Sequence, residues 1–144
     1  MADDDAAREV WLLMSDLVLD HTRRREVSEA LGMTFGRVRA IRTLAREPLS
    51  MGELAAALGI DRPNATVLVD DLEAQGIVRR RAHPTDRRAK LVEPTRRGKA
   101  LARRADEILA TPPAALAALD AAELATLRGI LERVRRRPQA SPSP

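Results

Sequence analysis

The residues best suited to recognise another molecule gather near the middle of this 144-residue chain, between positions 61 and 67. Arginine, asparagine and threonine side chains hydrogen-bond to base edges in the DNA major groove, and a valine can contact a thymine methyl group. The candidate base-reading residues are Arg62, Pro63, Asn64, Thr66 and Val67. Helical hairpins are common in soluble bundles, so this stretch alone fits an ordinary structural hairpin about equally well.

Positive charge is concentrated directly after this stretch. Residues 79–104 contain eleven Lys and Arg residues against two acidic ones, whereas the whole chain has a net charge of only +4. Such a cluster attracts a phosphate backbone. A solvated surface is the alternative, but the position of the run beside a helical hairpin favours DNA contact. The other candidate DNA contacts are Ser50, Arg79, Arg81, Asp86, Arg87, Arg88 and Lys90.

Two helices are expected to position the base-reading residues. Ser50 begins a capping-box pattern at the start of the first helix, and Gly59 supplies the turn that ends it. Asp61 is a favourable N-cap for the second helix. Apolar residues at helical spacing give that second helix one buried face, and its opposite face carries the candidate base-reading residues.

A hairpin is expected to follow, with strands at 77–82 and 87–92 and a turn at 83–86. Pro94 is expected to stop the second strand. A helix-turn-helix followed by a basic hairpin predicts a winged helix-turn-helix. The expected fold is therefore mainly α with a small β-hairpin wing.

Helical segments with apolar stripes flank this lobe. We expect a disordered start at 1–5, one domain over 6–137, and a disordered tail at 138–144. Within the domain, residues 34–94 form the winged lobe. Residues 6–31 and 96–137 form helices whose apolar faces need another surface to pack against. A two-fold dimer supplies that surface. The alternative is that both ends fold back on their own core.

The matching residues of a known family run from Leu54 to Asp61, from Thr66 to Glu73 and from Gly76 to Gly98. On these residues the chain resembles the MarR-type winged-helix transcriptional regulators, and the most specific part is Asp86 with Arg88, followed by Thr95 and Gly98. The resemblance implies a homodimer that binds double-stranded DNA. It also implies that Asp86 positions Arg88 for the minor groove.

The chain departs from the family pattern at three positions. Val67 and Asp71 stand where many relatives have a basic residue, and Pro94 stands where leucine is usual, so the second wing strand is expected to end early. The carboxylates of Asp70, Asp71 and Glu73 would be repelled by phosphate. Only the first two turns of the recognition helix are therefore expected to approach DNA closely.

The same resemblance implies a small-molecule effector of unknown identity, bound between the first two helices and the winged lobe. His21 lies on the apolar face of the first helix, where a packed histidine is the commoner outcome, and His83 is expected to be a phosphate neighbour or a plain surface residue. The candidate ligand contacts are Trp11, Met14, Val18, His21, Phe35, Arg39 and Arg42.

The composition excludes several classes of function. Without cysteine there is no disulfide, thiolate sensor or cysteine–zinc site. Two histidines and no phosphate-binding glycine motif argue against an enzyme, a metal site or a cofactor. The chain has no apolar run of membrane length and no signal peptide, so we expect a cytoplasmic protein with no membrane partner.

These observations together predict a sequence-specific, double-stranded DNA-binding transcriptional regulator. The expected form is a ligand-responsive repressor that binds an inverted repeat as a homodimer. The alternative is a winged-helix module that makes protein contacts or binds nucleic acid without sequence preference.

Overall fold

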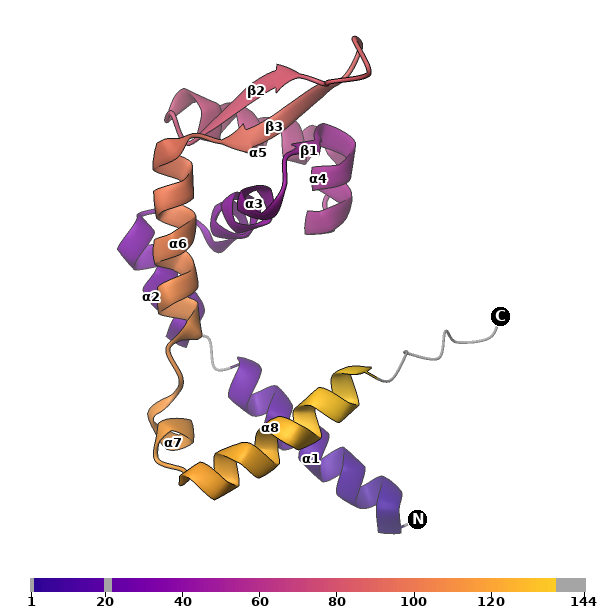
Figure 1. The fold of residues 1–144 in the computed structure, drawn as a ribbon, viewed down its shortest axis with the longest axis vertical. Coiled ribbons are helices and arrows are strands. Elements are labelled where there is room, and N and C mark those ends of the chain that lie inside the picture. Colours follow the sequence, from indigo (N-terminus) through magenta and orange to yellow (C-terminus); the bar gives the residue numbers. More distant parts are fainter. Residues whose placement is uncertain (1, 20–21, 137–144) are drawn as a thin grey trace, which may run out of the picture. The chain divides into compact units, whose positions relative to one another are not determined.

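The computed structural model describes residues 2–19 and 22–136, whose fold is shown in Figure 1. The chain divides into two units, of which the first ends at Ala110 and the second begins at Thr111. The prediction of a mainly helical fold with a small β wing is confirmed. The elements in chain order are α1 (Ala2–Leu19), α2 (Thr22–Leu31), α3 (Phe35–Arg46), β1 (Leu49–Ser50), α4 (Met51–Leu58), α5 (Arg62–Ala74), β2 (Val78–Ala82), β3 (Lys90–Pro94), α6 (Arg96–Ala110), α7 (Ala114–Ala117) and α8 (Ala121–Arg136).

Local sequence explains where helices α4 and α5 begin. The Ser50 hydroxyl accepts the backbone N–H of Glu53 at 3.3 Å, and a carboxylate oxygen of Asp61 accepts the backbone N–H of Asn64 at 2.8 Å. Each contact satisfies a donor that the first helical turn leaves without a partner. Between the helices, Gly59 has a φ of 67°, which a residue with a β carbon rarely adopts. The predicted N-caps at Ser50 and Asp61 and the predicted turn at Gly59 are confirmed.

The main core of the first unit lies between α3, α4, α5 and one face of the sheet. It includes Ile41 from α3, Leu54 from α4 and Leu72 from α5, all fully buried. Truncating one of these side chains to alanine would cost about 2–5 kcal/mol. A smaller cluster of Val27, Val38 and Ala105 joins α2, α3 and α6. Because α5 buries one face in this core, its other face is presented to solvent.

The sheet has the antiparallel order β1-β3-β2, and β2 with β3 makes the ribbon at the top of Figure 1. Val78 pairs with Pro94 at one end of the ribbon, and Ala82 pairs with Lys90 at the other. Side chains alternate between the two faces of a strand. Val78 is therefore directed to the core, whereas the next residue, Arg79, lies on the opposite face.

The wing differs from the sequence prediction in three ways. Strand β3 begins at Lys90 rather than at residue 87, because the turn before it is held by side-chain hydrogen bonds described below. Pro94 is the last paired residue of β3 rather than a stop before it, so the expectation of an early end is wrong. At Pro94 the strand has a neighbour on one side only, where a proline is tolerated as on an edge strand. The short strand β1 was not predicted.

The flanks also differ in detail. Helix α1 already includes residues 3–5, which were expected to be unstructured, and their three aspartates favour the positive end of the helix. The helix expected over 6–31 is described as α1 and α2, on either side of residues 20–21. His21 and the expected tail at 138–144 lie outside the described residues. In the part of the chain that the structure describes, no helix combines the length and apolarity needed to cross a membrane.

Candidate nucleic-acid interface

The first turn of α5 holds Asn64 in a fixed orientation. The Asn64 amide nitrogen donates to the second carboxylate oxygen of Asp61 at 3.0 Å, while the first oxygen caps the helix. Pro63 sits in the same turn, where its missing N–H costs no helical hydrogen bond. One amide N–H of Asn64 is thus engaged. Its amide oxygen has no partner among the described residues, which leaves an exposed group able to read a base edge.

The exposed face of α5 is short and mixed in character. Arg62 is exposed, and Val67 exposes 66% of its surface although it is a large apolar residue. The Thr66 hydroxyl donates to the Arg62 carbonyl at 3.0 Å, so its oxygen can still accept. The structure therefore places the five predicted base-reading residues on the first turns of one helix.

The carboxylates further along α5 are neutralised within the protein. Arg80 of β2 donates to Asp70 at 2.6 Å and to Glu73 at 2.7 Å, and Glu73 also accepts the Arg80 backbone N–H at 3.1 Å. Arg37 of α3 donates to Asp71 at 2.6 Å. The repulsion from phosphate that the sequence led us to expect is therefore reduced by arginines from neighbouring elements.

Arg80 also fastens the wing to the recognition helix. Partial burial opposes its charge, but the hydrogen bonds to Asp70 and Glu73 outweigh that effect and raise the pKa of Arg80. The guanidinium thus remains charged under all working conditions. Sequence reasoning did not single out this residue, because nothing in the run of arginines at 79–81 shows which of them reaches across to α5.

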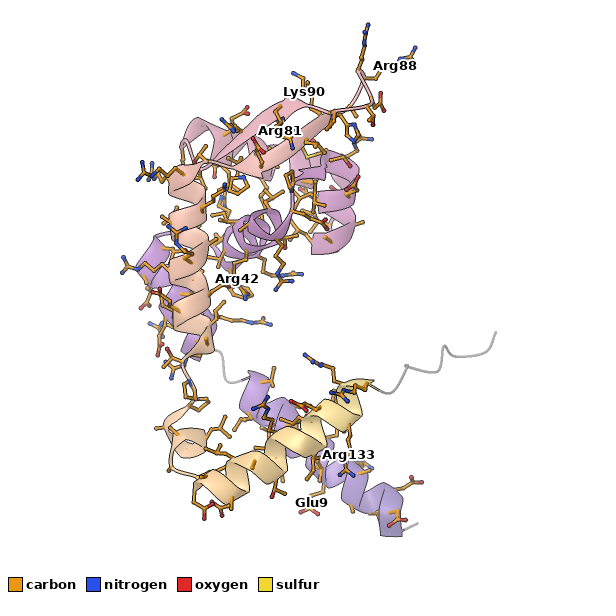
Figure 2. All side chains as sticks on the ribbon, in the orientation of Figure 1. Glu9, Arg42, Arg81, Arg88, Lys90 and Arg133 are labelled. Atoms are coloured by element: carbon orange, nitrogen blue, oxygen red, sulfur yellow. The ribbon has the colours of Figure 1, made fainter. Side chains whose placement is uncertain are left out.

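The cations of the wing fall into two groups. Arg79 and Arg81 both donate to Glu93 on the neighbouring strand, at 2.8 and 2.9 Å. The bond from Arg81, with that from Arg79, outweighs burial and lowers the pKa of Glu93. Arg87, Arg88 and Lys90 are exposed and have no carboxylate partner among the described residues. Figure 2 shows Arg88 at the far end of the ribbon, with Lys90 and Arg81 further back on the strands.

The wing turn is organised by His83, which sequence reasoning treated as a phosphate neighbour or a surface residue. Its Nδ1 accepts the backbone N–H groups of Thr85 at 3.2 Å and of Asp86 at 3.1 Å. Asp86 in turn accepts the backbone N–H of Arg88 at 3.0 Å. The aspartate therefore positions the main chain of Arg88, and the structure has no bond from Asp86 to the guanidinium in the residues it describes.

Comparison with known proteins agrees with this geometry. Residues 31–89 match the MarR family. The chain is also 33% identical over 121 residues to a Thauera aromatica protein described as a transcriptional regulator for the hcr operon, and the match covers 83% of this chain and 73% of that protein. The chain belongs to the MarR family. That family is one of transcriptional regulators, so the prediction that the chain is not an enzyme is confirmed.

Solved MarR-family structures share the fold. Apo wild-type MarR from E. coli superposes with a TM-score of 0.68 at 23% identity, over 88% of this chain and 95% of that one. NadR in complex with 4-hydroxyphenylacetate superposes with a TM-score of 0.61 at 25% identity, over 90% of this chain and 92% of that one. The second structure contains a small aromatic acid.

The predicted ligand contacts of this MarR-family chain lie in different surroundings. Trp11, Met14 and Val18 line an apolar hollow of about 270 Å³, and the described residues that line it all belong to α1. Phe35 packs on the smaller core cluster beneath the guanidinium of Arg24, whose carbon is 4.9 Å from the ring centre. Two further candidate ligand contacts lie on α3. Arg39 is exposed, and Arg42 is paired with Asp106 of α6 (Figure 2).

Proposed function

We propose that this MarR-family chain is a sequence-specific DNA-binding transcriptional regulator whose helix α5 enters a major groove while the wing turn reaches the adjacent minor groove. One observation carries the proposal. The first turns of α5 present Arg62, Asn64 and Val67 to solvent, while the carboxylates of its later turns are paired with arginines of the same lobe. A duplex can therefore approach α5 without meeting unpaired negative charge there.

Phosphate contacts should come from the cations without a carboxylate partner. Arg62 lies at the start of α5, and Arg87, Arg88 and Lys90 lie on or beside the wing turn. Each phosphate neutralised adds about 0.9 to the slope of log affinity against log salt. Binding to a duplex, measured by fluorescence anisotropy over a salt series, should therefore weaken steeply. An affinity that hardly changes with salt would contradict the proposal.

The working form we propose is a homodimer on an inverted repeat. MarR-family regulators bind DNA as dimers. Apolar side chains are exposed on both flanking helices, among them Trp11 and Leu17 on α1 and Ile130 and Val134 on α8. In a two-fold dimer, two copies of α5 would meet half-sites about one helical turn apart. Selection from a random DNA pool should enrich a palindrome. Absence of any enriched sequence would instead indicate a non-specific nucleic-acid-binding module.

We further propose that a small molecule relieves DNA binding, as expected of a repressor. The support is the apolar hollow beside Trp11, together with the small acid bound by the related NadR. A ligand releases DNA only if it prefers the conformation with lower DNA affinity. Bound DNA must then lower the affinity for the ligand by the same factor. Titration of small aromatic acids and phenols against the protein–operator complex tests this.

The proposed place of action is the cytoplasm, where the chromosome of a bacterial cell is found.

A further inference from the structure

One carboxylate lies in the middle of the basic wing. Glu93 stands directly opposite Arg79 in the strand register, and its side chain is only 15% exposed. One carboxylate oxygen accepts the Nε of Arg79 at 2.8 Å, and the other accepts the Nε of Arg81 at 2.9 Å. Arg79 and Arg81 are two positions apart, so they lie on the same strand face as Glu93.

This arrangement resembles the way a phosphate group would be held. Two oxygens of one anion each receive a guanidinium, which is the fork-shaped pairing that arginine also makes with phosphate. A DNA phosphate that approached either arginine would compete with an anion already in place on the neighbouring strand. The hydrogen bonds from Arg81 and Arg79 outweigh the opposing effect of burial and lower the pKa of Glu93, so its carboxylate stays ionised under the conditions of DNA binding.

We propose that Glu93 is an internal competitor of DNA phosphate, which holds Arg79 and Arg81 on the face of the ribbon and out of the DNA interface. This inference rests on the proposed DNA binding. It replaces the expectation that both arginines contact phosphate. The phosphate contacts of the wing then come from Arg87, Arg88 and Lys90, which have no carboxylate partner among the described residues.

Neutralisation of Arg79 and Arg81 by Glu93 affects the specificity of DNA binding. Phosphate contacts strengthen binding to every sequence, whereas contacts from α5 to base edges strengthen binding to the operator only. By withholding two cations, Glu93 lowers affinity for random DNA without touching the base-reading residues. The ratio of operator to random affinity is therefore higher than the charge of the wing alone would give.

The test compares the wild-type protein with the Glu93→Gln variant in binding to a random-sequence duplex over a salt series. Glutamine keeps the shape and one acceptor but loses the charge. The freed arginines should strengthen binding to random DNA and steepen the salt slope by up to about 1.8 for each protomer in contact. The ratio of operator to random affinity, measured on the selected palindrome, should fall.

Two controls separate release of the arginines from the simple loss of a negative charge. Glu53→Gln removes one charge from the same lobe, at an exposed side chain that has no ion pair among the residues that the structure describes. It should change the slope much less than Glu93→Gln does. The triple variant Arg79→Gln, Arg81→Gln, Glu93→Gln has no arginines to release, so its slope should return to that of the wild type.

Equal slopes for Glu93→Gln and Glu53→Gln would overturn the inference. So would a triple variant whose slope falls below the wild-type value, because that would place Arg79 or Arg81 on phosphate in the wild type. Both results leave the proposed function standing, since the wild type still binds DNA in each. A folded wild-type protein that binds no duplex would instead overturn the proposed function and this inference with it. Far-ultraviolet circular dichroism melts verify that each variant is folded.

Discussion

Asn64 is the residue on which sequence recognition depends most directly. Its side chain is held by Asp61 at 3.0 Å, so little rotamer freedom remains to be lost when it meets a base. An orientation fixed before binding favours one base edge over the others. The same bond explains why an N-cap aspartate and a base-reading asparagine three positions later act as one structural unit at the start of α5.

Asn64→Ala should therefore weaken binding to the selected operator by about 1–3 kcal/mol and leave binding to random DNA nearly unchanged. The preference at one position of each half-site should relax. Anisotropy titrations with both duplexes measure the two effects. Arg88→Ala is the matched comparison, because loss of a phosphate contact should weaken both duplexes alike and reduce the salt slope by about 1. An equal loss on both duplexes for Asn64→Ala would show that it does not read a base.

Glu93 also predicts a pH dependence of stability. Its pKa in the folded protein lies below the ordinary value of 4.5, so the folded state binds fewer protons than the unfolded state in the range between the two values. The stabilisation from its two arginines is therefore present above about pH 4.5 and is lost as the pH falls through the lowered pKa.

The measurement is the free energy of unfolding in urea for the wild type and Glu93→Gln, from about pH 7 to about pH 3. Wild type should be more stable near neutral pH, and the difference should shrink only below about pH 4.5. A difference that stays constant into the acid range would show that the ion pairs contribute nothing to stability.

At the scale of elements, the junction between the wing and α6 depends on a close backbone approach. A β carbon at Gly98 would lie 2.1 Å from the carbonyl oxygen of Ile77, which cannot move freely because it also accepts the Thr95 N–H at 2.9 Å. Gly98→Ala should therefore destabilise the protein by about 1–3 kcal/mol or more. Gly36→Ala in α3 is the control, because a β carbon there would meet no described atom within 4 Å beyond its chain neighbours and its own helix backbone, and no loss is expected. Urea denaturation measures both, and equal effects would refute the close approach.

The helices could be predicted from the sequence because their signals are local. Ser50, Asp61 and Thr95 each accept a backbone N–H three positions later, and the apolar spacing between them marks the buried faces. The start of β3 could not be predicted in this way. It depends on His83 accepting two backbone N–H groups and so lengthening the turn, and no periodicity in the sequence carries that information.

The ion pairs of the interface could not be predicted from the sequence either. Residues 79–81 are three consecutive arginines, which the sequence presents as one basic run. In the structure the middle one reaches α5 and the outer two reach Glu93, because successive residues of a strand face opposite sides. The register that places Arg79 opposite Glu93 would have been enough to assign different partners to the three arginines. That register is set by the turn, whose geometry could not be predicted from the sequence.

At the scale of the whole molecule, the flanking helices carry more exposed apolar surface than a solitary chain would favour. On α1, Val10, Met14 and Leu17 lie along one face, and Trp11 with Val18 widens it. Trp11 exposes 66% of its surface and Val18 exposes 70%. Large contiguous patches of this kind mark sites of association. The proposed dimer would cover this face and hold two copies of α5 at a fixed separation.

A matched pair of substitutions tests that arrangement. Leu12 and Leu17 are each 52% exposed on α1, but five positions of helix place them about 140° apart, with only Leu17 in the apolar stripe. Leu17→Glu should yield monomers at concentrations where the wild type is dimeric, as measured by light scattering after size exclusion. Leu12→Glu should remain dimeric. Because a monomer occupies one half-site at a time, Leu17→Glu should also lose most of its operator affinity and about half of its salt slope. If both variants behave alike, or if the Leu17 variant stays dimeric with full affinity, this face of α1 does not form the dimer.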